Sequence, residues 1–134
     1  LEFKATLRWD ITMGMVNKKL EEAIVKTVAA FANSQGGTLL IGVADDRTVV
    51  GLGHDYVSLG DGDRDKLEVH LRNLLNQQLG TAFVTSKVQV CFHEIDENEV
   101  CQVDVSPARY PVIVKVGKIK MCVCVGKHWA KVEF

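Results

Sequence analysis

The stretch Ile24–Val43, IVKTVAAFANSQGGTLLIGV, decides the fold because it places an amphipathic helix, a helix stop and a buried strand in direct succession. Apolar side chains recur at helical spacing over residues 20–31, which predicts a helix that begins around Asn17 and buries one face. The Gly36-Gly37 pair ends that helix, since glycine readily adopts the backbone conformation of a helix end. The run that follows, Thr38–Val43, is apolar nearly throughout and predicts a buried strand.

Further strands and a second helix are expected on either side of this stretch. The strands are apolar runs between turn residues, and they are Glu2–Arg8, Val49–Leu52, Val84–Ile95, Val100–Val105, Val112–Val116 and Lys120–Val125. Leucines at helical spacing over residues 67–79 mark the second helix, with Asp61 or Asp63 as its cap and Gly80 at its end. The order β-α-β-β-α-β-β-β-β predicts an α+β fold with a mixed, mostly antiparallel sheet and two main helices, packed on one side of the sheet.

Length and composition describe an ordinary globular domain. The chain has 134 residues, of which 47% are hydrophobic and 25% are charged, so it can bury a core without disulfides. Its apolar runs are too short to span a membrane, and no N-terminal signal is visible, so no membrane partner is expected. We expect residues 1–134 to form a single domain that is a fragment of a longer chain, since the sequence opens inside the first predicted strand.

The four cysteines predict reduced thiols in a cytoplasmic protein. They all lie in apolar, strand-like runs, and no C-x-x-C motif occurs. A metal site made of Cys91, His93 and Cys101 is an alternative, because residues two apart in a strand share a face. Their spacing matches no familiar zinc pattern, and we therefore expect no metal site.

Charge is distributed unevenly along the chain. Six aspartates lie between residues 45 and 65 against two arginines, whereas six lysines and arginines follow residue 106 against one glutamate. In the last predicted hairpin, strand alternation puts Lys118 and Lys120 on one face, with Lys115 across the turn. Such a face suits a phosphate backbone, although a solvated edge that discourages strand association is the equal alternative. The net charge of -1 argues against bulk electrostatic capture of DNA and allows such a local patch.

Two carboxylates are the candidate catalytic residues. Glu2 lies on the first predicted strand, and Asp45 follows the buried strand. If those strand ends adjoin, the pair could share a divalent cation that activates water for attack on a phosphodiester. The alternative is a surface glutamate and a turn aspartate. ATP is not expected as a cofactor, because the chain has no Walker A motif.

Several stretches together resemble the Schlafen AlbA-like DNA-binding domain family. They are residues 1–4 (LEFK), 24–43, 49–52 (VVGL), 63–65 (DRD), 92–95 (FHEI) and 101–107 (CQVDVSP). The resemblance covers nearly the whole chain, and AFANSQGGTLLIGV is its most specific part. It implies a bacterial or archaeal type of nucleic-acid-binding module in a transcription-associated or regulatory protein, without enzymatic activity. We expect the phosphate contacts to come from Lys4, Arg8, Lys115, Lys118, Lys120 and Lys127.

The resemblance also implies a first alternative, a divalent-metal-dependent endoribonuclease. Some animal Schlafen cores cleave tRNA and rRNA with acids that map to Glu2 and Asp45, and Mg²⁺ or Mn²⁺ would then be the cofactor. The family's first glutamate would precede Leu1 and is not in this sequence, which argues against catalysis.

Near its end the sequence departs from the family pattern. Cys122 and Cys124 stand where relatives have an aromatic residue and an arginine, and the loss of a planar arginine weakens phosphate contact. A second alternative follows from the predicted sheet, because an exposed strand edge could form a homodimer or bind another protein.

Overall fold

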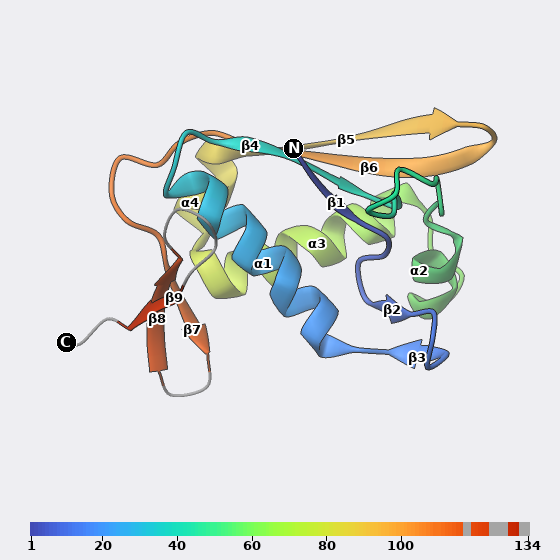
Figure 1. Cartoon of the computed structure of the whole chain (residues 1–134), viewed down its shortest axis with the longest axis horizontal. Helices are drawn as coiled ribbons and strands as arrows, with labels where there is room; N and C mark the ends of the chain where they lie inside the picture. Colours follow the sequence, from blue (N-terminus) through green and yellow to red (C-terminus); the bar gives the residue numbers. More distant parts are fainter. Residues whose placement is uncertain (117–118, 124–128, 132–134) are drawn as a thin grey trace.

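The structure of the chain, a computed structural model, describes residues 1–116, 119–123 and 129–131, with side chains as far as Val114. The elements are β1 (Glu2–Lys4), β2 (Trp9–Asp10), β3 (Met15–Val16), α1 (Lys18–Ala32), β4 (Gly37–Ile41), α2 (Gly53–Ser58), α3 (Arg64–Leu79), α4 (Thr81–Lys87), β5 (Val88–Ile95), β6 (Asn98–Val105), β7 (Ile113–Val116), β8 (Ile119–Val123) and β9 (Trp129–Lys131) (Figure 1). No helix within these described ranges is long and apolar enough to cross a membrane.

The connection from α1 to β4 forms as the sequence predicts. Asn17 caps the start of α1, because its side-chain oxygen accepts a hydrogen bond of 2.9 Å from the Lys19 N–H. At the other end of α1, Gly36 has a φ of +82°, a conformation that residues with a side chain rarely adopt. A Cβ on Gly36 would also lie 2.5 Å from the Val105 carbonyl oxygen, so glycine is required where the chain turns into β4.

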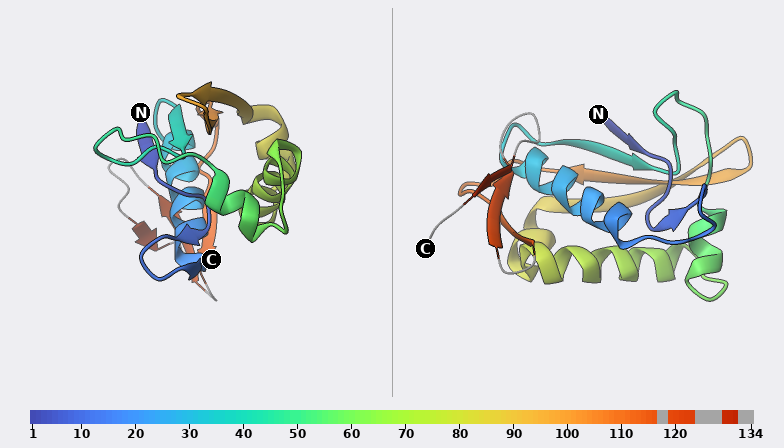
Figure 2. Two further views of the ribbon diagram at one scale, coloured as in Figure 1. Left: turned by 90° about the vertical axis from the view of Figure 1, so that its right-hand side faces the viewer. Right: turned by 60° about the horizontal axis from the view of Figure 1, so that its bottom comes forward.

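The central sheet has four strands in the order β1-β4-β6-β5. β1 runs parallel to β4, and the other two pairs are antiparallel, which confirms a mixed, mostly antiparallel sheet. Helices α1 and α3 lie below the same face of this sheet in Figure 1, and the turned views in Figure 2 show the same arrangement. The predicted α+β fold with helices on one side is therefore confirmed.

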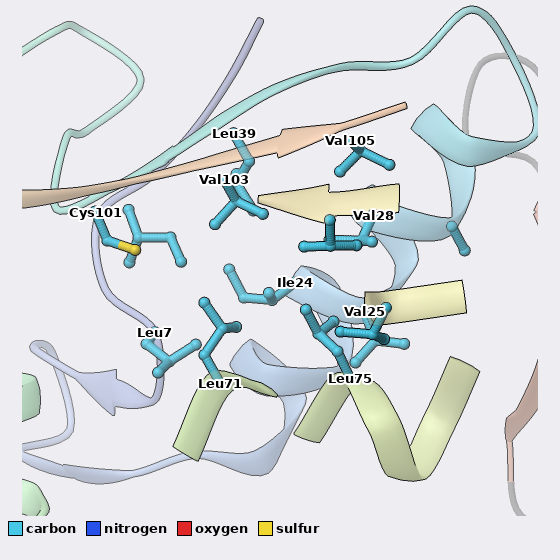
Figure 3. Close-up of a cluster of buried hydrophobic side chains, with 14 of the residues drawn as sticks. Leu7, Ile24, Val25, Val28, Leu39, Leu71, Leu75, Cys101, Val103 and Val105 are labelled. Atoms are coloured by element: carbon cyan, nitrogen blue, oxygen red, sulfur yellow. The ribbon is translucent and has the colours of Figure 1, made fainter. Parts of the chain in front are cut away.

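The core fills the space between the sheet and these two helices. Alternate residues of β6, namely Cys101, Val103 and Val105, point down from the sheet in Figure 3. They meet side chains of α1 and α3 such as Ile24 and Leu71, both fully buried. Full burial of one such aliphatic side chain contributes about 1.5–3 kcal/mol, so this layer supplies much of the folding free energy.

Two of the predicted strands differ from the structure. The predicted strand Val84–Ile95 begins only at Val88, because residues 81–87 form α4; Gly80, with a φ of +93°, lets this new helix begin directly after α3. Residues 49–52 form no strand, and an isolated bridge joins Val43 to Val49. The N–H groups of Val50 and Gly51 both donate to the carbonyl oxygen of Gly42, so no regular ladder can continue.

The other differences concern short elements. The first predicted strand ends at Lys4, and a small ribbon of β2 and β3 follows it. Residues 53–58, for which no element was predicted, form α2. Of the two expected caps of α3, Asp63 is the one that accepts a hydrogen bond, 3.0 Å long, from the Lys66 N–H. A separate three-stranded sheet consists of β7, β8 and β9. The sequence pattern alone does not distinguish these strands from those of the central sheet.

A buried carboxylate fixes the chain after β1. Asp55 in α2 is fully buried, and its two oxygens accept hydrogen bonds from the consecutive N–H groups of Leu7 (2.8 Å), Arg8 (3.0 Å) and Trp9 (3.1 Å). A buried charge needs such partners, because each hydrogen bond to an ionised group replaces part of its lost hydration. The Asp55 contact therefore fixes the backbone of residues 7–9, in which Leu7 lies in the core and Arg8 is half-buried.

We expect Asp55→Ala to destabilise the fold strongly, because three backbone N–H groups would lose their acceptor in a buried site. The loss in the free energy of unfolding should be about 3–5 kcal/mol, measured by urea denaturation. Asp46→Ala is the matched control, since exposed Asp46 accepts only a local hydrogen bond of 2.9 Å from the Thr48 N–H. Equal losses for the two variants would contradict a structural role for Asp55.

Candidate nucleic-acid interface

Two of the predicted phosphate-binding residues, Lys4 and Arg8, lie four residues apart where the chain leaves β1. The Lys4 carbonyl oxygen accepts hydrogen bonds from the Gly42 N–H (2.7 Å) and the Val43 N–H (3.3 Å), which fixes the end of β1. Four residues later, the Arg8 carbonyl oxygen accepts a hydrogen bond of 2.8 Å from the Asn17 N–H at the start of α1. Both basic residues are half-buried, and no ion pair involves either of them within the described part of the chain.

Arg8 has an unsatisfied hydrogen-bond donor. Its Nε is buried and has no hydrogen-bond partner among the described atoms. Arg64 and Arg72 differ in this respect, because each donates its Nε–H to a carboxylate, Glu99 and Glu68 respectively. A buried donor without an acceptor costs about 1–3 kcal/mol, so the described residues leave part of the hydrogen-bonding capacity of Arg8 unused.

The second group of predicted residues belongs to the β7–β8 hairpin. Asn33, just after α1, fixes its start by two hydrogen bonds with the Val112 backbone, of 3.0 Å to the carbonyl oxygen and 2.7 Å from the N–H. The antiparallel register then pairs Lys115 with Lys120.

The predicted basic residues therefore form two groups, one toward each end of α1. The helix has 15 residues, which at 1.5 Å per residue is about 22 Å. At 3.4 Å per base pair, this length matches about six base pairs of duplex DNA. Two predicted members of the hairpin face, Lys118 and Lys127, lie outside the described residues.

The candidate catalytic carboxylates are placed apart along the sheet. The parallel register pairs Glu2 with Leu39, whereas Asp45 lies beyond the far end of β4 in an exposed turn closed by a hydrogen bond from Ala44 to Thr48. Lys4, at the other end of β1, is the residue that meets the chain leading to this turn. The strand ends adjoin, but the register does not set Glu2 opposite Asp45, and the ribonuclease alternative stays a prediction.

A cluster under the β5–β6 hairpin neutralises one further arginine. Arg64 forms an ion pair with Glu99 and lies over the Phe92 ring, 5.9 Å from its centroid. The Tyr56 hydroxyl donates a hydrogen bond of 3.2 Å to the same carboxylate, and burial followed by the charge of Glu99 raises the pKa of Tyr56. Arg64, which lies in the stretch 63–65 of the family resemblance, thus links α3 to β6. Its role is therefore structural, and it is not a phosphate contact.

The alternative of a metal site made of Cys91, His93 and Cys101 is not supported, because these residues lie on opposite faces of the sheet. Cys91 and His93 are exposed, with Sγ and Nε2 3.6 Å apart, and His93 Nε2 lies 2.7 Å from the Gln102 side-chain oxygen. Cys101 pairs with Phe92 and is fully buried in the core. Burial raises the pKa of the Cys101 thiol to about 12. Within the described ranges, no group of three or more potential metal ligands occurs.

Comparisons with known proteins place this geometry in context. A family model described as Schlafen, AlbA_2 matches residues 1–131. Among solved structures, the chain is similar to the DIP2311 protein from Corynebacterium diphtheriae, with a TM-score of 0.56 and 20% identity. That match covers 92% of this chain and 25% of the DIP2311 chain, so the sequence spans about a quarter of that protein and the likeness concerns the fold. No curated protein matches the sequence.

The opposite positions of the two thiols predict different reactivity. Only the thiolate reacts with alkylating reagents, so iodoacetamide at pH 8.5 should modify exposed Cys91 and leave Cys101 unmodified in the folded protein. In urea, both should react. Peptide mass spectrometry measures the modification of each residue. Equal labelling of Cys91 and Cys101 in the native protein would contradict the assigned faces of β5 and β6.

Proposed function

Because the chain belongs to the Schlafen AlbA_2 family, which is nucleic-acid-related, we propose that it binds the phosphate backbone of duplex DNA as a non-enzymatic regulatory module. The contacts would come from Lys4 with Arg8, from Lys115 and Lys120 in the β7–β8 hairpin, and from Lys118 and Lys127, which lie outside the described residues. Contacts of this kind position a duplex without reading its sequence, so the proposal includes no base recognition.

The proposal rests mainly on Arg8, whose Nε–H has no hydrogen-bond partner and whose charge is not paired with an acid among the described residues. Its backbone is fixed on both sides, by Asp55 at the N–H and by Asn17 at the carbonyl oxygen, so the residue's position is determined before any ligand arrives. Its buried Nε lacks an acceptor, and no carboxylate in the described structure neutralises its charge. A phosphate would supply the missing negative charge, and arginine binds phosphate in a planar, multidentate manner.

Two further features support a polyanionic ligand rather than a single small anion. Lys4 ends β1, and Arg8, which follows it, is hydrogen-bonded through its backbone to Asn17 at the start of α1. The paired positions Lys115 and Lys120 lie toward the opposite end of α1. An anion with regularly spaced charges can contact both groups at once, whereas one phosphate ion cannot span about 20 Å.

We expect Arg8→Gln to weaken binding to a fluorescein-labelled duplex about tenfold, a value typical for loss of a good charge-assisted contact. The slope of log affinity against log salt should also fall by about 0.9, because one phosphate neutralisation is lost. Fluorescence anisotropy over a salt series measures both quantities. Lys19→Gln removes the same charge from an exposed position on α1 and serves as the matched control.

The same titration with Lys115→Gln and Lys120→Gln tests the second group, and single-stranded DNA and tRNA serve as competitors. Urea denaturation of each variant verifies that folding is intact. The proposal is refuted if folded Arg8→Gln and Lys19→Gln bind the duplex equally, or if the unmodified chain shows no salt-dependent binding. Preference for tRNA over the duplex would replace DNA with RNA as the ligand.

A further inference from the structure

The outer edge of β5 is an open sheet edge. β5 is the last strand in the order β1-β4-β6-β5, and it has eight residues, against three in the opposite edge strand β1. In the described structure, β6 is the only strand that pairs with it. Long edge strands usually carry a protective feature such as proline, a bulge or lysine, and the β5 sequence VQVCFHEI contains neither proline nor lysine.

Alternation along the ladder identifies the backbone groups that face outward. The Ser106 N–H donates a hydrogen bond of 2.9 Å to the Lys87 carbonyl oxygen, so Lys87 and Ser106 form a hydrogen-bonded pair at the end of the β5–β6 register. Every second residue from Lys87 therefore bonds to β6, and the N–H and C=O groups of Val90, Phe92 and Glu94 point to the open edge. The Val88 N–H is the exception, because it donates to the Val84 carbonyl oxygen.

We propose that β5 pairs with β5 of a second copy of this chain, antiparallel and about a two-fold axis at Cys91. The two central sheets would then form one continuous sheet. In this register Val90 of one copy and Phe92 of the second copy exchange both backbone hydrogen bonds, and the symmetry repeats that pair on the other side of the axis. This inference does not depend on nucleic-acid binding.

Side-chain complementarity favours a second copy as the occupant. Partly buried Val90 and Phe92, which pack against the core, face each other across the axis on the helix-covered side of the sheet. On the open side, exposed Gln89 lies opposite His93 of the second copy, a pair that can exchange a hydrogen bond. Cys91 meets Cys91 at a non-hydrogen-bonded position, where Cα atoms are about 4.5 Å apart.

Charge and register support the same arrangement. Lys87 precedes β5, whereas Glu94, Asp96 and Glu97 lie at its far end, so antiparallel pairing brings the basic end of each strand beside the acidic end of the other. The proposed register also opposes Val88 with Glu94, but only at the ends of the paired stretch, beyond both Val90–Phe92 pairs. A register centred on Val90 would bring Val88, whose N–H is already bonded, directly beside the axis pair.

Light scattering after size exclusion should give a mass twice the 14.8 kDa of the chain at high protein concentration. The double variant Gln89→Lys, His93→Lys sets like charges opposite each other in the proposed register and should give a monomer. Gln77→Lys, at an exposed position of α3, is the matched control and should remain dimeric. A monomeric unmodified chain, or a dimer unaffected by the double variant, would overturn the proposal.

Cross-linking of Cys91 tests the register itself. In a background of Cys122→Ser and Cys124→Ser, diamide should join two chains through Cys91, as two thiols lose two protons and two electrons to the reagent and form one disulfide. The proposed Cα separation falls within the range that a disulfide spans. Cys91→Ser should abolish the covalent dimer without changing the mass in reducing buffer. A noncovalent dimer that diamide fails to link would exclude this axis.

Discussion

The contact of Asp55 with the backbone of residues 7–9 is the constraint on which the described arrangement depends. It joins α2 to the segment between β1 and β2, elements that lie 46 to 48 residues apart in sequence. Because the carboxylate is fully buried, its charge is tolerated only with these N–H partners in place. The same contact positions Leu7 in the core and leaves the Arg8 side chain half-buried. Core packing and the proposed phosphate binding therefore both depend on this contact.

Arg8 illustrates how a fold can prepare a binding residue without a ligand. Its main chain is held at both polar groups, and its side chain keeps a buried donor without an acceptor. Arg64 shows the opposite outcome, because Glu99 and the Phe92 ring occupy its guanidinium. Arg8 and Arg64 carry the same formal charge in the sequence. Only the acids around each arginine determine which of the two can bind a phosphate.

The open edge of β5 and the basic groups use different parts of the molecule. Edge pairing would extend the sheet beyond β5, whereas Lys4 ends β1, the strand at the other edge, and Arg8 follows it. Association of two copies would therefore leave the first basic group accessible and place a copy of it on each side of the joined sheet. Avidity from two such groups would add to the affinity of a single domain for a long polyanion.

Four features could be predicted from the amino-acid sequence, because hydrophobic periodicity and glycine stops act over short distances. They are the central α1–β4 unit, the strand β6, the leucine face of α3 and the mixed sheet. The sequence could not separate α4 from β5, since Thr81–Val90 has no strong period and only Gly80 marks the change. Nor could it distinguish Asp55 from the exposed aspartates around it. Three other features depend on which distant segments the fold brings into contact, so they could not be predicted from the sequence. They are the burial of individual polar residues such as Asp55, the pairing of arginines with acids, and the separation of the basic residues along α1.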